Sequence, residues 1–280
     1  MKKVGKERIN WPVTILLIAG VITVIFPLYM TVVIALKKPS EMTNDIAGIL
    51  SLPKHFSLSN FAEAMKVTDF WNSLGNSLLI TIVTVVFAIL IHSLLGYAIA
   101  RNKAHSKFYK FIYFYVVSGM FVPFAILMMP VVKQTAQMGL ANRAGVIILY
   151  LVFYMPMNVL LYSGYLTNIP MALEEAAKVD GAGTVTRFFR ITLPMLKPTI
   201  ILAVFLSITS SLQCFDLIYT MTGGGPNNAS TTLVIYAYSL CFAGSSSAGY
   251  AMAVSNILFV VILVIAMLQR GMMKREASEI

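Results

Sequence analysis

The sequence has few charged residues and almost no cysteine. Charged residues make up 11% of the 280 residues and apolar residues 58%, whereas ordinary globular proteins have about 25% and about 45–50%. The two cysteines, Cys214 and Cys241, show no metal-ligand spacing and fall in or beside apolar stretches, so a disulfide framework is not indicated. This composition argues against a soluble globular chain and favours a membrane protein.

The sequence also lacks motifs for nucleotide binding and for catalysis. It contains no Gly-x4-Gly-Lys-Ser/Thr and no Gly-x-Gly-x-x-Gly run, which are the glycine-rich loops that hold phosphates. The run Gly223-Gly-Gly-Pro226 has no Lys-Ser/Thr behind it, so we interpret it as a turn. The histidines offer no metal spacing. We therefore predict that the chain is not an enzyme, holds no metal or cofactor, and takes any energy for transport from a partner subunit or an ion gradient.

Six apolar stretches are long enough to cross a membrane, because a spanning helix needs about 20 mainly apolar residues. Their continuous runs favour helices over a barrel, whose strands alternate. Pro123 and Pro130 interrupt the third run, and Pro156 lies in the fourth. We predict an all-α polytopic membrane protein with six transmembrane helices at residues 13–36, 77–100, 111–132, 145–166, 199–221 and 248–269.

The distribution of Lys and Arg predicts the orientation, because these residues are enriched in cytoplasmic segments. With the N-terminus inside, the inner segments carry 15 of them and the outer segments six. This bias accounts for the net charge of +10 better than nucleic-acid binding does. The apolar core of a signal peptide has about 7–15 residues. The first apolar run is longer than this, so we predict that it is retained in the protein. The prediction is a cytoplasmic segment 1–12, a transmembrane domain 13–270 and a cytoplasmic tail 271–280.

One polar stretch, residues 170–194, interrupts the apolar pattern between the fourth and fifth spans, and the orientation predicts that it is cytoplasmic. Its residues predict two short helices around a turn, because helix starters, a turn-forming glycine and helix-ending prolines follow one another. The carboxylates fall early in the first helix, where the helix dipole favours them. The residues that carry this prediction are Pro170, Glu174, Glu175, Asp180, Gly181, Thr184, Pro194 and Pro198.

The polar stretch resembles the signature loop of the membrane subunits of ABC importers. The pattern is Glu-Ala-Ala, two residues, Asp-Gly-Ala, eight residues and Ile-x-Leu-Pro, and it is most similar to carbohydrate importers of the maltose-transporter type. The resemblance covers most of the chain, from the first span to the sixth. It implies a coupling hairpin whose first helix docks in a groove of an ATPase. The coupling residues that it implies are Glu175, Ala176, Ala177, Asp180, Gly181, Ile191, Leu193 and Pro194.

The resemblance also implies a function and a set of partners. The chain would be the permease subunit of an ATP-driven importer that moves sugars or oligosaccharides by alternating access across a prokaryotic cell membrane. Its partners would be a second homologous permease, two cytoplasmic ATPase subunits that bind ATP and Mg, and an extracellular sugar-binding protein. The first two-thirds of the chain resemble one permease partner and residues 216–226 resemble the other, so which half of the heterodimer this is stays open.

Two alternatives to a sugar importer remain. The first is an ABC importer for another solute, such as a phosphodiester or a peptide. The second is a secondary carrier or channel that works alone, which should show paired charges in the spans or internal repeats. The sequence shows one carboxylate in the spans and no clear repeat.

Polar and aromatic side chains in the spans are candidates for the substrate pathway, because a sugar site needs groups that bind hydroxyls and aromatic faces. Asp216 is the only acidic residue in a predicted span, where a carboxylate is costly, although it could instead reach the headgroups. In the fourth span, Tyr150, Tyr154, Asn158 and Tyr162 recur every four residues, and helix packing is the alternative role for this stripe. An interhelical bond is the alternative role for Asn256. We expect a packing contact or an interhelical bond for His92. The candidates are Tyr154, Asn158, Gln213, Asp216, Tyr219 and Asn256.

Overall fold

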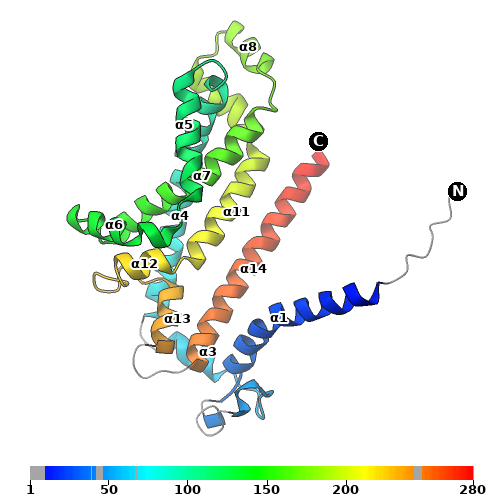
Figure 1. The fold of residues 1–280 in the computed structure, drawn as a ribbon, viewed down its shortest axis with the longest axis vertical. Helices are drawn as coiled ribbons and strands as arrows, with labels where there is room; N and C mark the ends of the chain where they lie inside the picture. The colour runs from blue at the N-terminus through cyan, green and yellow to red at the C-terminus, as the bar shows by residue number, and fades with distance from the viewer. Residues whose placement is uncertain (1–9, 39, 42–46, 67–68, 243–247, 280) are drawn as a thin grey trace, which may run out of the picture. The chain divides into compact units, whose positions relative to one another are not determined.

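The computed structural model describes residues 10–38, 40–41, 47–66, 69–242 and 248–279, and within these ranges every regular element is a helix (Figure 1). Backbone contacts divide the chain into two units. The first unit contains residues 1–68 and 237–257, and the second contains residues 69–236 and 258–280. The two units are described separately below.

The first unit is built around α1 (Trp11–Ala35). It also contains η1 (Ala47–Leu50), α3 (Ser59–Lys66), and parts of α13 (Leu233–Phe242) and α14 (Ala248–Glu279). Most side chains of α1 are apolar and exposed, with no charged residue among them, which is what a helix surrounded by lipid requires. α1 therefore agrees with the first predicted span.

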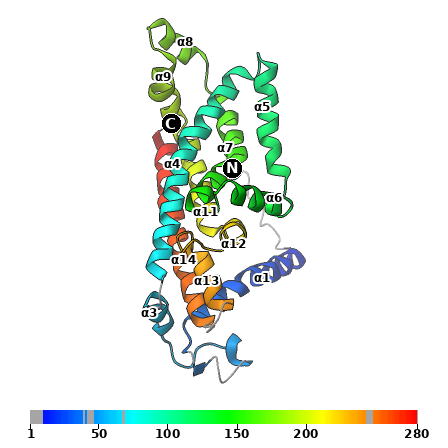
Figure 2. The same cartoon turned by 90° about the vertical axis from the view of Figure 1, so that its left-hand side faces the viewer.

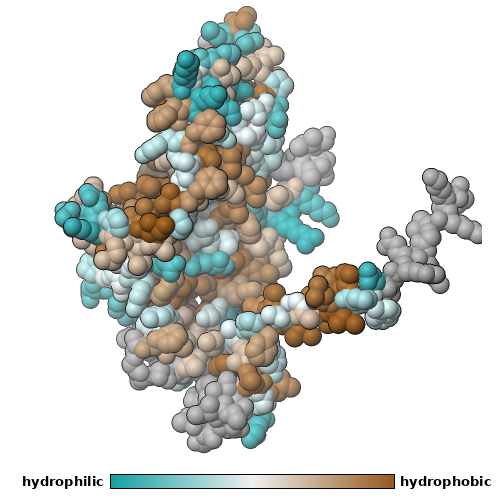
Figure 3. Space-filling model, in the orientation of Figure 1, coloured by the Kyte–Doolittle hydropathy of each residue, from teal (hydrophilic) through white to brown (hydrophobic). Residues whose placement is uncertain are grey.

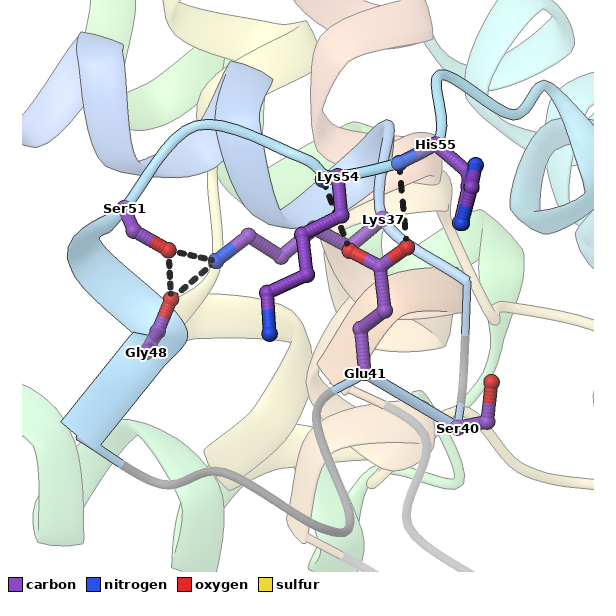
Figure 4. A pocket seen from close by; sticks show the side chains of 7 residues that line it. All are labelled: Lys37, Ser40, Glu41, Gly48, Ser51, Lys54 and His55. Carbon is purple, nitrogen blue, oxygen red and sulfur yellow. Dashed lines mark hydrogen bonds between the residues drawn. The ribbon is translucent and has the colours of Figure 1, made fainter.

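The loop after α1 is held by bonds between charged side chains and the backbone (Figure 4). The Lys37 ammonium donates to the carbonyl of Gly48. The Glu41 carboxylate accepts from the backbone N–H groups of Lys54 and His55, both at 3.1 Å. These side chains line a polar cavity of about 310 Å³, so polar bonds rather than apolar packing hold this loop in place.

The second unit is centred on three helices, α4 (Phe70–Asn102), α7 (Arg143–Leu166) and α11 (Lys197–Gln213) (Figure 2). Small and polar residues line the buried face of α4, which allows close helix approach in a membrane. A Cβ at Gly96 would lie 2.7 Å from the Cβ of Tyr162, so glycine is needed where α4 meets α7. Figure 3 shows apolar side chains over the middle of this unit, while polar ones gather near α8 (Ala172–Val179).

Four described helices are long and apolar enough to span a membrane, namely α1, α4, α7 and α14, and two bent helix pairs raise the number to six. The prediction of an all-helical polytopic membrane protein is confirmed, with four to six spans. Most of the predicted N-terminal segment, 1–12, lies outside the described residues. The predicted tail, 271–280, continues α14 as far as Glu279.

The third predicted span, 111–132, which Pro123 and Pro130 interrupt in the sequence, is a pair of helices with a sharp bend between them. α5 (Lys107–Ser118) and η2 (Gly119–Phe121) are followed by α6 (Phe124–Gln137), and the two arms meet at 105°. The bend falls at Pro123, which has no N–H to donate and disfavours a helical conformation in the residue before it.

The fifth predicted span, 199–221, is wrong as a single helix because α11 ends at Gln213. Cys214 is extended, with ψ at 116°, and α12 (Asp216–Met221) begins after Phe215. Asp216 therefore lies in the first turn of α12, where the helix dipole favours a carboxylate. The span is a helix, a break and a short second helix.

Candidate functional site

The polar stretch 170–194 forms the predicted hairpin. α8 ends at Val179 and is followed by Gly181, whose φ of 83° is left-handed, and α9 (Thr184–Arg187) begins three residues after that glycine. The N–H of Gly181 donates to Lys178 at 3.1 Å and that of Ala182 to Ala177 at 2.8 Å, which is the Schellman ending of a helix. A Cβ at Gly181 would meet no atom within 4 Å, so the backbone conformation alone selects glycine here.

The prolines of the hairpin begin helices and do not end them, which corrects the prediction. The segment η3 (Phe188–Thr192) is a π-helical turn, α10 (Leu193–Met195) follows it, and Pro194 and Pro198 occupy first-turn positions of α10 and α11. The helices on either side of Leu196 meet at 75°. Pro198 has no N–H for the carbonyl four residues back, so the chain bends there.

The hairpin is fastened to α4 through Glu174, which is 5% exposed. Arg101 donates from Nε to Glu174 Oε1 at 2.9 Å, and its Nη2 lies 2.7 Å from the same oxygen as an ion pair. Tyr97 donates to Oε2 at 2.7 Å, and Thr192 donates to Oε1 at 3.2 Å. One buried carboxylate therefore joins the end of α4, the first helix of the hairpin and its π-helical turn.

Arg101 also binds the end of α7. Its Nη1 donates to the carbonyls of Leu166 and Ile169 at 3.1 and 3.2 Å, the first at the last residue of α7 and the second just beyond it. We call these residues, with Tyr97, Glu174 and Thr192, the Arg101 cluster. It fixes the hairpin to both long helices.

Sequence reasoning missed the role of Glu174 and Arg101. It placed Glu174 only in the helix dipole and chose Glu175 as the coupling carboxylate. A signal was present, because Tyr97 and Arg101 are four residues apart at the end of an apolar run and so share a helix face. The sequence offered no way to pair that face with a carboxylate 73 residues away.

The predicted coupling residues lie mostly on the outside of the hairpin. Their neighbours include large apolar side chains with high exposure, Val179 at 87% and Val185 at 71%. The exposed surface of the hairpin therefore contains both carboxylates and apolar side chains. Of the coupling candidates, the exposed ones are Glu175, Ala176, Asp180, Gly181 and Pro194, and the half-buried ones are Ala177, Ile191 and Leu193.

A second arginine lies at the other end of the parallel helices α4 and α7. Arg143 donates from Nε to the carbonyl of Ala229 at 2.7 Å and from Nη2 to Asn76 Oδ1 at 2.6 Å. Asn76 in turn donates to the carbonyls of Asn228 and Thr231 at 2.9 and 3.0 Å. These five residues, the Arg143 cluster, fasten the loop after α12 to the starts of α4 and α7.

The glycine run in that loop is a turn, as its composition predicts, and it is tightly bonded. Gly223 and Gly224 have φ of 57° and 93°. A Cβ at Gly224 would lie 2.4 Å from Oγ1 of Thr231, which itself donates to the Gly224 carbonyl at 3.2 Å. Glycine is required here by both conformation and space.

The candidates in the fourth span lie among buried helix contacts. The Asn158 amide nitrogen lies 3.0 Å from His92 Nδ1 and donates to Ser207 Oγ at 3.4 Å. These bonds link α7 to α4 and α11 and give His92 the interhelical bond expected of it. The ring of Tyr154 lies 5.3 Å from that of Tyr150, which is fully buried. Both candidates thus have packing contacts of their own.

The candidates in the fifth span come together around its break. Gln213 ends α11, Asp216 begins α12, and both are exposed, as is Tyr219, whose ring stacks on that of Phe215 at 4.9 Å. Backbone that leaves the helix at membrane depth is tolerated where it lines a cavity or is buried in protein. A carboxylate, an amide and an aromatic ring are therefore exposed in the residues on either side of the break.

Asn256 bonds a neighbouring helix within the first unit. Its amide donates to the carbonyl of Thr31 in α1 at 3.0 Å and to that of Met252 at 2.9 Å. The described residues bring no three His, Cys, Asp or Glu side chains together as metal ligands.

Comparison with known proteins identifies the family. The model of the family described as "Binding-protein-dependent transport system inner membrane component" matches residues 92–274, which include the hairpin, α7 and α11. This chain belongs to that family. The prediction of an ABC importer permease is thereby confirmed, and the permease is a multi-pass membrane protein.

Several relatives of this permease are named as sugar transport subunits. It is 34% identical over 202 residues to the multiple sugar-binding transport system permease protein MsmG of Streptococcus mutans, covering 71% of this chain and 70% of the relative. It is 33% identical over 174 residues to the melibiose/raffinose/stachyose import permease protein MelC of Bacillus subtilis, covering 61% of each. The names of these relatives describe permeases and no enzyme.

Solved structures share the fold. A chain of a bacterial ABC transporter involved in the import of the acidic polysaccharide alginate superposes with a TM-score of 0.74. It is 17% identical, and the match covers 92% of this chain and 94% of that one. This likeness concerns the arrangement of the helices.

Proposed function

We propose that this chain is the permease subunit of an ATP-driven importer that moves sugars or oligosaccharides into the cell by alternating access. The observation that carries the coupling part of this proposal is the Arg101 cluster. Glu174 is buried and bonded from α4 and η3 at once, so a force on the hairpin is transmitted to α4. At about 1.5 Å per residue, the 33 residues of α4 extend about 50 Å, enough to cross the bilayer.

The hairpin offers a surface on which a cytoplasmic ATPase can act. Its exposed face combines Glu175 with the apolar side chains Val179 and Val185, and an amphipathic helix of this kind suits a groove on a partner. The excess of Lys and Arg in the inner segments supports a cytoplasmic hairpin and cytoplasmic termini. ATP and Mg would be bound by two ATPase partners and not by this chain.

The remaining partners follow from the relatives. MsmF and MsmG of Streptococcus mutans are both named as permease proteins of a multiple sugar-binding transport system, which supports a second permease beside this one. The alginate transporter has been solved in complex with a periplasmic protein that carries an alginate pentasaccharide, which supports a solute-binding protein on the outer side. Sugars are the cargo named for MsmG and MelC.

Uptake measurements test this function. Cells that lack the chain are expected to lose uptake of at least one labelled sugar and to recover it with the wild-type chain. The Gly181→Asp chain is expected to reach the membrane and fail to restore uptake, because a side chain strains the left-handed turn and adds a carboxylate to the exposed face of the hairpin. The tagged wild-type chain is expected to copurify with an ATPase. Unchanged uptake across the sugar panel, or normal uptake by Gly181→Asp, contradicts the proposal.

A further inference from the structure

A groove between α11 and the end of α14 lies outside the coupling site and the candidate substrate pathway. Both segments belong to the second unit, and α14 runs beside α11 there (Figure 1). Gln269 joins them by donating to the carbonyl of Ile201 at 2.6 Å. Beside this bond is an open groove of about 550 Å³, large enough to hold part of an elongated molecule.

The groove has one charged end and apolar walls. Arg270 and Lys274 are four residues apart on α14 and therefore share a face, and both are exposed. Leu202, Phe205 and Met273 form the walls. The described residues that line the groove include no carboxylate, so its charged end is positive.

The position of the cations along α14 indicates what they meet. The preceding turns expose Leu263, Val264, Met267 and Leu268, each between 43% and 66% exposed, as lipid-facing residues of a span do. Arg and Lys directly after such a run reach the headgroup level. The groove therefore combines cations at the depth of lipid phosphates with apolar walls at the depth of acyl chains.

We propose that this groove binds a phospholipid with an anionic headgroup. The phosphate lies against Arg270 and Lys274, and one acyl chain lies along Leu202 and Phe205. A soluble anion would satisfy the cations but leave the apolar walls in contact with water, whereas a phospholipid satisfies both parts. Basic pockets between membrane helices bind anionic headgroups on this principle.

Native mass spectrometry of the full chain in detergent tests the site, with phosphatidylglycerol and phosphatidylcholine of identical acyl chains as probes. The wild-type chain is expected to retain one phosphatidylglycerol with about 25-fold preference, because each cation near an anionic surface contributes about fivefold. The double variant Arg270→Gln/Lys274→Gln is expected to lose this preference. The control Lys107→Gln/Lys110→Gln removes two exposed cations from α5 and is expected to keep it.

A second variant tests the apolar wall without altering charge. Ala266, which also lines the groove, is replaced by Phe, and retention of both lipids is expected to fall by a similar factor. Equal retention of the two lipids by the wild-type chain, or equal loss of preference in the Lys107/Lys110 control, overturns the proposal. Displacement of the lipid by glycerol 3-phosphate overturns it in favour of a soluble anion.

Discussion

The two arginine clusters lie at opposite ends of the same pair of helices and bind different partners. Arg101 and Glu174 have side chains only 11% and 7% exposed and form an ion pair. Arg143 is half-buried and binds the neutral oxygens of Asn76 and Ala229. Glu174 is buried, and a buried carboxylate needs a counter-charge, which Arg101 supplies. The oxygens that Arg143 binds are neutral, so the two arginines differ in the charge of their partners.

The two clusters also have different structural roles. The Arg101 cluster joins the hairpin, which is mostly surface, to the long helices by bonds that are expensive to break. The Arg143 cluster fixes a glycine-rich loop through backbone carbonyls, so it sets the shape of that loop. We therefore expect the first cluster to transmit movement and the second to hold a turn in place.

The largest effect is expected from unpairing the Arg101 cluster. In Arg101→Met, Glu174 is left as a buried charge without its cation, which costs about 3–5 kcal/mol. Arg101→Met/Glu174→Met removes both charges and is expected to be more stable than Arg101→Met alone. Thermal unfolding of the purified chains measures both effects. If the double variant is as unstable as the sum of the single variants, the two residues do not act as a buried pair.

A smaller effect is expected at the other end. Arg143→Met removes two hydrogen bonds from a charged donor, each worth about 1.5–3 kcal/mol, but the oxygens that it leaves are neutral, so no buried charge is left unpaired. Hydrogen exchange is expected to speed up in residues 222–232 and to stay unchanged in the hairpin. Faster exchange of the hairpin, or a loss of stability equal to that of Arg101→Met, would remove the distinction between the clusters.

The sequence predicts those parts of this molecule that depend on local signals. Runs of about 20 apolar residues locate the spans, and the polar stretch with its glycine locates the hairpin and its turn. α1, α4, α7 and α14 correspond to four of the predicted spans, although α4 begins seven residues before its predicted span and α14 ends ten residues after its own. The family signature in the hairpin predicts that Glu175 and Gly181 are coupling residues.

The features that the sequence did not predict depend on contacts between distant residues. Pro123 indicated an interruption, but the 105° bend also depends on the packing of both arms. No proline lies at the break after Gln213, so the sequence carries no local signal for it. The pairing of Arg101 with Glu174 joins segments 73 residues apart, and in one sequence Glu174 and Glu175 have the same local chemistry. Only the fold decides which of them is buried.

The smallest effect on stability is expected from Glu175→Gln. Glu175 is exposed, and substitutions at such sites usually change the unfolding free energy by no more than about 0.5 kcal/mol. The same substitution at the neighbouring residue, Glu174→Gln, leaves Arg101 without a counter-charge. This variant is expected to be far less stable than Glu175→Gln. If Glu175 contacts an ATPase, Glu175→Gln is expected to lower sugar uptake without changing the unfolding temperature.

The matched control for this variant is Glu63→Gln. Glu63 is also an exposed carboxylate on a short helix, and its Lys66 partner lies 3.0 Å away at the surface, where ion pairs contribute little. Glu63→Gln therefore removes the same charge as Glu175→Gln, but from a helix outside the hairpin. Equal uptake by the two variants would mean that Glu175 has no role at a partner surface. Lower uptake with Glu175→Gln alone would assign anchoring to Glu174 and docking to Glu175, two adjacent carboxylates separated in function by burial.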